Sequence, residues 1–237
     1  MKEILRLSVT QIRIFATDTL GYRYFRSPSS VAELKQRYGF DTQTSPFEGL
    51  PIESPSIAFT SGQFAIDDKK YLIESLTLED RRIVFTISAS SSIADRFFAN
   101  LLEVLRAFDL REPGPKYDVL VLAQETICIA KLDLRFEDLL CNSQESIHKG
   151  LETLSALPGY KVRVFPTSLK FAVRYLDIPE EMKTHNVTMI DKDIVIEVRA
   201  KTDPGDGIFF TQSPFDSDSH LKLLSTIEDA VRTGKQD

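Results

Sequence analysis

Residues 81–110 constrain the fold more than any other stretch of this chain. Residues 82–88 alternate between apolar and polar side chains, the pattern of a strand that buries one face. A serine run follows, in which Ser92 and Asp95 have the spacing of a helix-capping box, so we predict that a helix begins there. Its apolar stripe consists of Ile93, Phe97, Leu101, Leu105 and Phe108. Such a stripe needs an apolar partner, and the sheet that contains residues 82–88 is the nearest one.

The residues before this stretch predict three strands and a short helix. The strands are expected at 4–15, 56–66 and 70–78, the helix after a cap formed by Ser30 and Glu33, and a loop at 41–55. The helix should end at Gly39. In the first strand the apolar positions change parity near Thr10, which predicts a β-bulge at that residue.

The proline- and glycine-rich residues 111–116 interrupt the chain, and a similar order of elements follows. Strands are predicted at 126–136, 161–165, 169–176, 187–190, 194–201 and 208–212, with one helix capped by Asn142 and Glu145, a tight turn at 191–193, and a last helix from Asp218 or Ser219. The fold class is therefore α+β, with an antiparallel sheet and long helices on one face.

Both halves can be described as one strand, a helix, three to five strands and a long helix. Residues 79–87 also resemble residues 190–198, since both are amphipathic strands after a charged turn. We therefore expect two halves, 1–112 and 117–237, that share one curved sheet. This order of elements resembles the TATA-box-binding-protein-like fold over nearly the whole chain, without a shared motif. A helix-grip fold and two ferredoxin-like units are alternatives.

The composition narrows the class of protein. The chain has 237 residues, of which 42% are hydrophobic, enough for a substantial core. Its apolar runs are far shorter than the roughly 20 residues that cross a bilayer, and its charged, alternating N-terminal segment does not resemble a secretory signal. With only two cysteines, Cys128 and Cys141, we expect a cytoplasmic protein without a disulfide and without membrane attachment.

One predicted surface is basic, although the net charge of the chain is −6. On the strands of the second half, the face opposite the apolar residues collects eight cations against the carboxylates of Asp133 and Glu197, a net of +6. The eight cations are Lys131, Arg135, Lys161, Arg163, Lys170, Arg174, Arg199 and Lys201. Such a surface could bind an acidic protein or a phosphate backbone, or it could simply keep exposed strands soluble.

Motifs for catalysis are sparse. The three histidines, His148, His185 and His220, lie in separate predicted elements, and none has a second ligand at the spacing of a zinc site. No glycine-rich phosphate loop is present. We therefore assign no catalytic, cofactor-binding or metal-binding residues.

The leading hypothesis from the sequence is a non-catalytic binding or assembly protein. Its exposed sheet face or an edge strand would recognise a protein partner or a second copy of the chain, giving a homo-oligomer. The first alternative is nucleic-acid binding through the eight basic residues. The second is an enzyme or small-molecule binder with a pocket between sheet and helices, lined by residues such as Phe97, Phe98 and Phe171.

Overall fold

The computed structural model describes residues 1–16, 27–44, 56–108, 117–133, 167–177, 179–185 and 190–233. Its strands are β1 (Glu3–Phe15), β2 (Thr42–Thr44), β3 (Ile57–Ile66), β4 (Lys69–Leu78), β5 (Arg82–Ile87), β6 (Val119–Lys131), β7 (Ser168–Val173), β8 (Lys192–Val198) and β9 (Ile208–Ser213). Its helices are α1 (Pro28–Tyr38), α2 (Ser91–Ala107), α4 (Glu180–Thr184) and α5 (Ser217–Thr233), with a short 3-10 turn at Pro204–Asp206.

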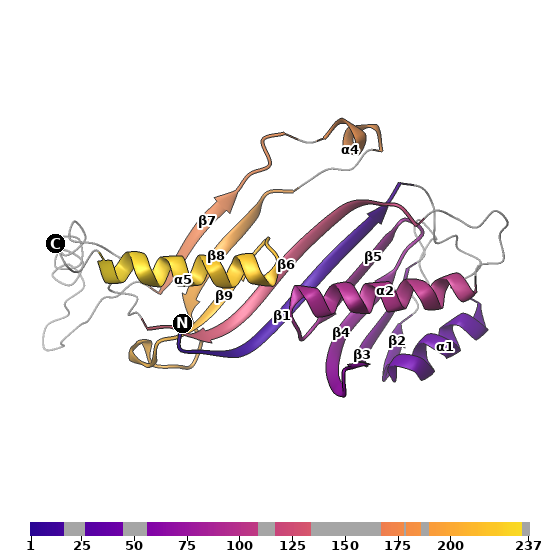
Figure 1. Cartoon of the computed structure of the whole chain (residues 1–237), viewed down its shortest axis with the longest axis horizontal. Helices are drawn as coiled ribbons and strands as arrows, with labels where there is room; N and C mark the ends of the chain where they lie inside the picture. The colour runs from indigo at the N-terminus through magenta and orange to yellow at the C-terminus, as the bar shows by residue number, and fades with distance from the viewer. Residues whose placement is uncertain are drawn as a thin grey trace, which may run out of the picture.

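The described strands form a single antiparallel sheet in the order β2-β3-β4-β5-β1-β6-β9-β8-β7. The two longest strands, β1 and β6, pair with each other at its centre (Figure 1). Strands β2 to β5 extend the sheet on the side of β1, and β9, β8 and β7 extend it on the side of β6. Segments from the two ends of the chain therefore belong to one sheet.

The long helices α2 and α5 lie on the same face of this sheet, with α1 beside α2 (Figure 1). We call the opposite face the outer face. The apolar stripe of α2 packs in a core with β1, β3, β4, β5 and α1, where the ring of Phe97 contacts the rings of Tyr38, Phe64 and Phe85. A smaller core under α5 is centred on Leu224, Phe209 and Ile196. The predicted α+β class with an antiparallel sheet is confirmed.

All three described long helices begin slightly earlier than the sequence predicts. In α1 the cap is Ser27, which accepts a hydrogen bond from the Ser30 amide, because Pro28 is well suited to the first helical position. Helix α2 begins at Ser91, and Asp95 is not engaged in capping because it accepts a hydrogen bond from Gln11 on β1. Helix α5 begins at Ser217.

The central strands differ from the prediction in register and length. No bulge occurs at Thr10, since β1 pairs continuously with β6 from Arg6 to Ile14 and shows irregularities only beyond these two residues. The parity change arises because the apolar Ile12 and Ile14 lie on the outer face, while Gln11 is buried beneath α2. Strand β6 also begins at Val119, before the predicted start.

Outside the centre, three local predictions are corrected or extended. The predicted loop at 41–55 contains the short strand β2. Residue 190 is not in a strand, and the predicted turn at 191–193 is replaced by the start of β8. The connection from β7 to β8 instead includes α4. The predicted strand at 161–165 and the helix capped by Asn142 lie outside the described residues.

Candidate functional site

Five of the eight predicted basic residues lie in the described part of the chain, where they fall into two groups. Arg135, Lys161 and Arg163 lie outside the described residues. Lys170 lies on β7 and Arg174 just after it, whereas Arg199 and Lys201 follow the far end of β8 and Lys131 ends β6. Lys170 pairs with Val195, and Arg199 lies four residues beyond Val195, about 13 Å along the strand.

The group at the β7 end is partly neutralised by carboxylates that the sequence analysis did not count. Lys170 pairs with Asp193 at 2.7 Å, and Arg174 approaches Asp191 at 3.7 Å. These pairs are exposed, so they contribute little to stability, but they lower the local positive charge. The other group keeps its positive charge, as the sequence predicts, because Lys131, Arg199 and Lys201 form no ion pair with the described residues.

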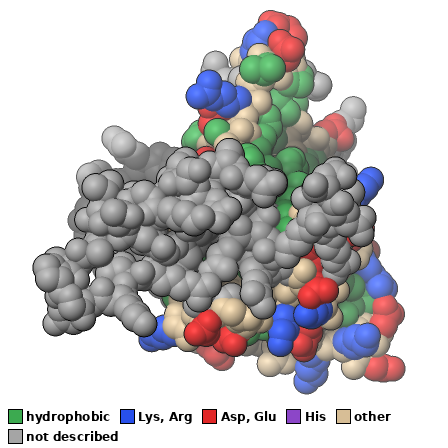
Figure 2. Space-filling model, turned by 90° about the vertical axis from the view of Figure 1, so that its left-hand side faces the viewer, with side chains coloured by type: hydrophobic (Ala, Val, Ile, Leu, Met, Phe, Trp, Pro, Cys, Tyr) green, Lys and Arg blue, Asp and Glu red, His purple; other side chains and the backbone are tan. Residues whose placement is uncertain are grey.

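An exposed apolar segment adjoins the β7 end. The segment that connects β7 to β8, which we call the arm (174–177, 179–185 and 190–191), rises from the sheet in Figure 1. Leu176 is 90% exposed and Ile190 74% exposed, and Tyr175 and Phe171 are also exposed. We call these four side chains the arm patch. Figure 2 shows hydrophobic side chains along this projecting part of the molecule. Exposed apolar side chains that occur close together are typical of interaction surfaces, and these four lie on β7 or between it and the start of β8.

The arm also borders a small, mainly apolar cavity on the outer face. This cavity of about 210 Å³ is lined on the sheet side by Ile12, Ile14 and Val121 and on the arm side by Tyr175 and Ile190. The two sides come from segments that are distant in the sequence. Phe97 and Phe98, which the sequence analysis assigned to a pocket, are buried in the core of the first half instead, and Phe171 lies on β7.

A polar cluster occupies the outer face beside this cavity. Glu74 lies where the pairing of β4 with β5 shifts, and it accepts hydrogen bonds from Arg6, Ser8 and Ser88 at 2.6–2.9 Å. Burial alone would raise the pKa of Glu74, but these hydrogen bonds outweigh it and hold the pKa below its ordinary value. The carboxylate is therefore a stable anion that joins three strands.

One buried histidine was not singled out in the sequence. His220 on α5 is 1% exposed, and its Nδ1 and Nε2 lie 2.7 Å and 2.8 Å from the hydroxyls of Ser213 and Thr211 on β9. The alternation of side chains along β9 could have indicated this group, since Thr211 and Ser213 lie on the same face of the strand as the buried Phe209. Because Ser213 and Thr211 are fully buried as well, this group is a structural network of the core.

The described residues contain no group of three or more His, Cys, Asp or Glu side chains that could hold a metal ion. The thiol of Cys128 is free and buried, and burial raises its pKa to about 11, which makes it a poor nucleophile. No helix in the described part of the chain is long and apolar enough to cross a bilayer.

The comparisons with known proteins found no similar protein. No family model matches the chain, and neither the curated proteins nor the solved structures contain a match.

Proposed function

We propose that this protein is a non-catalytic binding or assembly protein that recognises a protein partner, or a second copy of itself, through the arm patch. The observation that carries the proposal is the exposure of Leu176 and Ile190, 90% and 74%, on a projecting segment. Burying an exposed leucine side chain stabilises a complex by about 1.5–3 kcal/mol. In a monomer, the exposed parts of these side chains contribute no burial free energy.

The neighbouring strand β7 supports the same surface. It is the last strand of the described sheet and pairs only with β8 among the described strands. The edge of β7 that no described strand pairs with carries backbone groups that can pair with a strand of another molecule. Phe171, exposed on this strand, would extend an apolar contact from the arm along the edge.

We also propose that the chain consists of two related halves, 1–112 and 117–237. Their strands occur in mirrored order around the β1–β6 pair, and α2 and α5 each begin four residues after the strands β5 and β9 end. Ile87 pairs with Val9 and Ser213 with Thr126, while Val9 and Thr126 pair with each other. An internal two-fold axis requires this pattern. The order is similar to the TATA-box-binding-protein-like fold.

The resemblance noticed between residues 79–87 and 190–198 does not contribute to this proposal. It compares β5 with β8, whereas the position in the sheet makes β9 the counterpart of β5.

The test is the native mass of the purified protein, measured for the unchanged chain and for the variant Leu176→Glu/Ile190→Glu. We expect an oligomer or a co-purified protein that the variant loses. Leu72→Glu is the control, because Leu72 is an exposed leucine on β4, in the other half of the sheet, and this variant should keep the native mass. A monomer without partner for the unchanged chain would refute the proposal.

Nucleic-acid binding through the basic residues is the alternative, supported by Lys131, Arg199 and Lys201, which lack ion pairs with the described residues. It predicts co-purified nucleic acid and an affinity that falls steeply with salt. Charge reversal of Lys131, Arg199 and Lys201 together should abolish that binding. Two results together would exclude nucleic-acid binding. The purified protein would contain no nucleic acid, and the variant would bind duplex and single strands with the same affinity as the unchanged chain.

A further inference from the structure

A second concave site lies at the opposite end of the sheet from the arm. It is a pocket of about 480 Å³ formed by the last turn of α1, strands β3 and β4, and α2. This volume is within the range of small-molecule sites. The local sequence does not reveal this pocket, because its residues come from four separate elements.

The polar groups of this pocket are mainly hydrogen-bond donors. Arg37 and Lys70 contribute two positive charges, and neither forms an ion pair with the described residues. None of the described residues that line the pocket is acidic. Elsewhere in this half, Arg6, Arg82 and Arg96 each pair with a carboxylate. Two cations that lack an ion-pair partner among the described residues therefore share one concavity, on a protein whose net charge is −6.

A hydrogen bond and a nearby charge involve these groups. The Tyr38 hydroxyl donates to Oδ1 of Asn100 at 3.0 Å, and the guanidinium of Arg37 acts to lower the pKa of the same hydroxyl. Because Oδ1 of Asn100 is engaged, the amide nitrogen of Asn100 remains as a donor. Burial is the main cause that raises the pKa of Tyr38, so this hydroxyl keeps its proton. Glu33 and Glu103 act electrostatically on Tyr38 but do not line the pocket.

The C-terminal end of α1 disfavours anion binding in this pocket, but only weakly. The C-terminus of a helix carries a partial charge of roughly −0.5, which falls off within a turn. The two full positive charges of Arg37 and Lys70 exceed it. Part of the wall is aromatic, since the buried Tyr38 and Phe64 line the same pocket.

The geometry points to a binding site for a small organic anion, in which a phosphate or carboxylate group contacts Arg37, Lys70 and Asn100 and an aromatic or apolar body packs on Tyr38 and Phe64. This site is independent of the arm patch. Charge-assisted hydrogen bonds would hold the anionic group, and the apolar wall would favour aromatic over inorganic anions.

The test is calorimetric titration of the full chain with phenyl phosphate, benzoate and inorganic phosphate at about 0.15 M salt. We expect saturable binding of phenyl phosphate or benzoate, tighter than that of inorganic phosphate. Arg37→Gln/Lys70→Gln should weaken this binding by about tenfold or more, and Asn100→Asp should weaken it as well.

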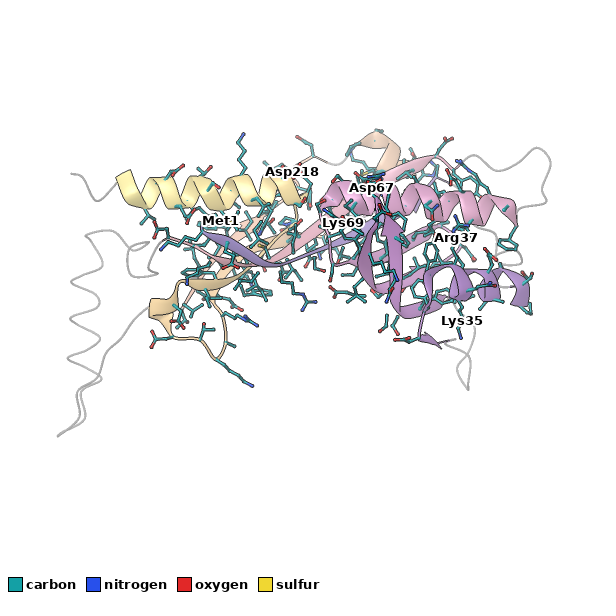
Figure 3. The ribbon with its side chains drawn as sticks, turned by 60° about the horizontal axis from the view of Figure 1, so that its bottom comes forward. Met1, Lys35, Arg37, Asp67, Lys69 and Asp218 are labelled. Carbon is teal, nitrogen blue, oxygen red and sulfur yellow. The ribbon has the colours of Figure 1, made fainter. Side chains whose placement is uncertain are left out.

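The matched control is Lys35→Gln/Lys69→Gln. It removes the same charge from the same two elements, but Lys35 and Lys69 do not line the pocket. In Figure 3 Arg37 lies on the α2 side of α1 and Lys35 on the opposite side. The control should keep the affinity within about twofold. Failure of phenyl phosphate and benzoate to bind, or an equal loss in both double variants, would overturn the inference. Thermal unfolding of each variant verifies that it is folded.

Discussion

At the scale of single residues, the hydrogen bonds of His220 determine its tautomer. The Thr211 hydroxyl donates its one hydrogen to the Cys128 carbonyl oxygen, so it can only accept from Nε2–H of His220. Nδ1 is then bare and accepts from the Ser213 hydroxyl. Both ring nitrogens are satisfied while the ring is neutral. Burial lowers the pKa of His220 to about 4, because the imidazolium would be poorly solvated.

This lowered pKa predicts that the protein loses stability in mild acid. An unfolded histidine titrates near pH 6.5, so between pH 6.5 and about 4 the unfolded state binds a proton that the native state does not. Stability is therefore complete above this range and falls as the pH decreases. We expect the free energy of unfolding, measured in urea, to drop by about 2 kcal/mol from pH 7.5 to pH 5 through this residue.

The variants His220→Asn and His185→Gln separate this residue from other acid effects. His220→Asn should lose that part of the pH dependence, although it is less stable at every pH. His185, which follows α4 outside the two core clusters, is the control, and His185→Gln should keep the full dependence. Parallel curves for the unchanged chain and His220→Asn would contradict the prediction.

At the scale of elements, the two long helices meet at their first residues. The amide of Ser91 donates to the hydroxyl of Ser217 at 3.0 Å, and the amide of Ser217 donates to the hydroxyl of Ser91 at 2.8 Å. Amides in the first turn of a helix have no partner within the helix. Each long helix therefore caps the other, and this contact connects the core of the first half to the core of the second.

Removing either hydroxyl should destabilise the protein, because one buried amide then lacks an acceptor. We expect Ser91→Ala and Ser217→Ala each to cost about 1 kcal/mol in the free energy of unfolding, measured by urea denaturation at neutral pH. The control is Ser92→Ala, since the exposed Ser92 hydroxyl hydrogen-bonds only to Ser90 among the described residues, and it should change stability by less than about 0.5 kcal/mol. An equal cost for all three variants would argue against mutual capping.

At the scale of the whole molecule, β1 joins the two halves. It pairs with β5 of its own half and, over almost its entire length, with β6 of the other half. Separating the halves would expose the backbone groups of two long central strands, which is costly. The two cores are therefore expected to unfold together.

The variant Thr10→Pro tests this coupling. Thr10 pairs with Thr86 on one side and Glu125 on the other, so proline removes a ladder hydrogen bond at the centre of the sheet. We expect a loss of about 3 kcal/mol or more, with a single thermal transition and with equal loss of hydrogen-exchange protection in β5 and β9. Two separate transitions would show that the halves are independent.

Several features could be predicted because local sequence specifies them. The alternation in 82–87 and the stripe on 91–107 follow from the periods of strand and helix, and the turn at Asp67 and Asp68 follows from residue types that tolerate positive φ. Gly39 ends α1 in the left-handed conformation that glycine favours. These elements were enough to predict an antiparallel α+β sheet with its helices on one face.

Only the tertiary structure determined where the candidate sites lie. Tyr175 approaches Ile12, and Arg37 shares a pocket with Lys70 and Asn100, because strand pairing brings distant segments together. Parity assigns cations to a face but does not place them along the strands, so Lys170 and Arg174 were grouped with Arg199 and Lys201, which follow the other end of β8. Periodicity reports which side of an element a residue occupies. Which elements become neighbours depends on the register and packing of the whole sheet, which no local pattern contains.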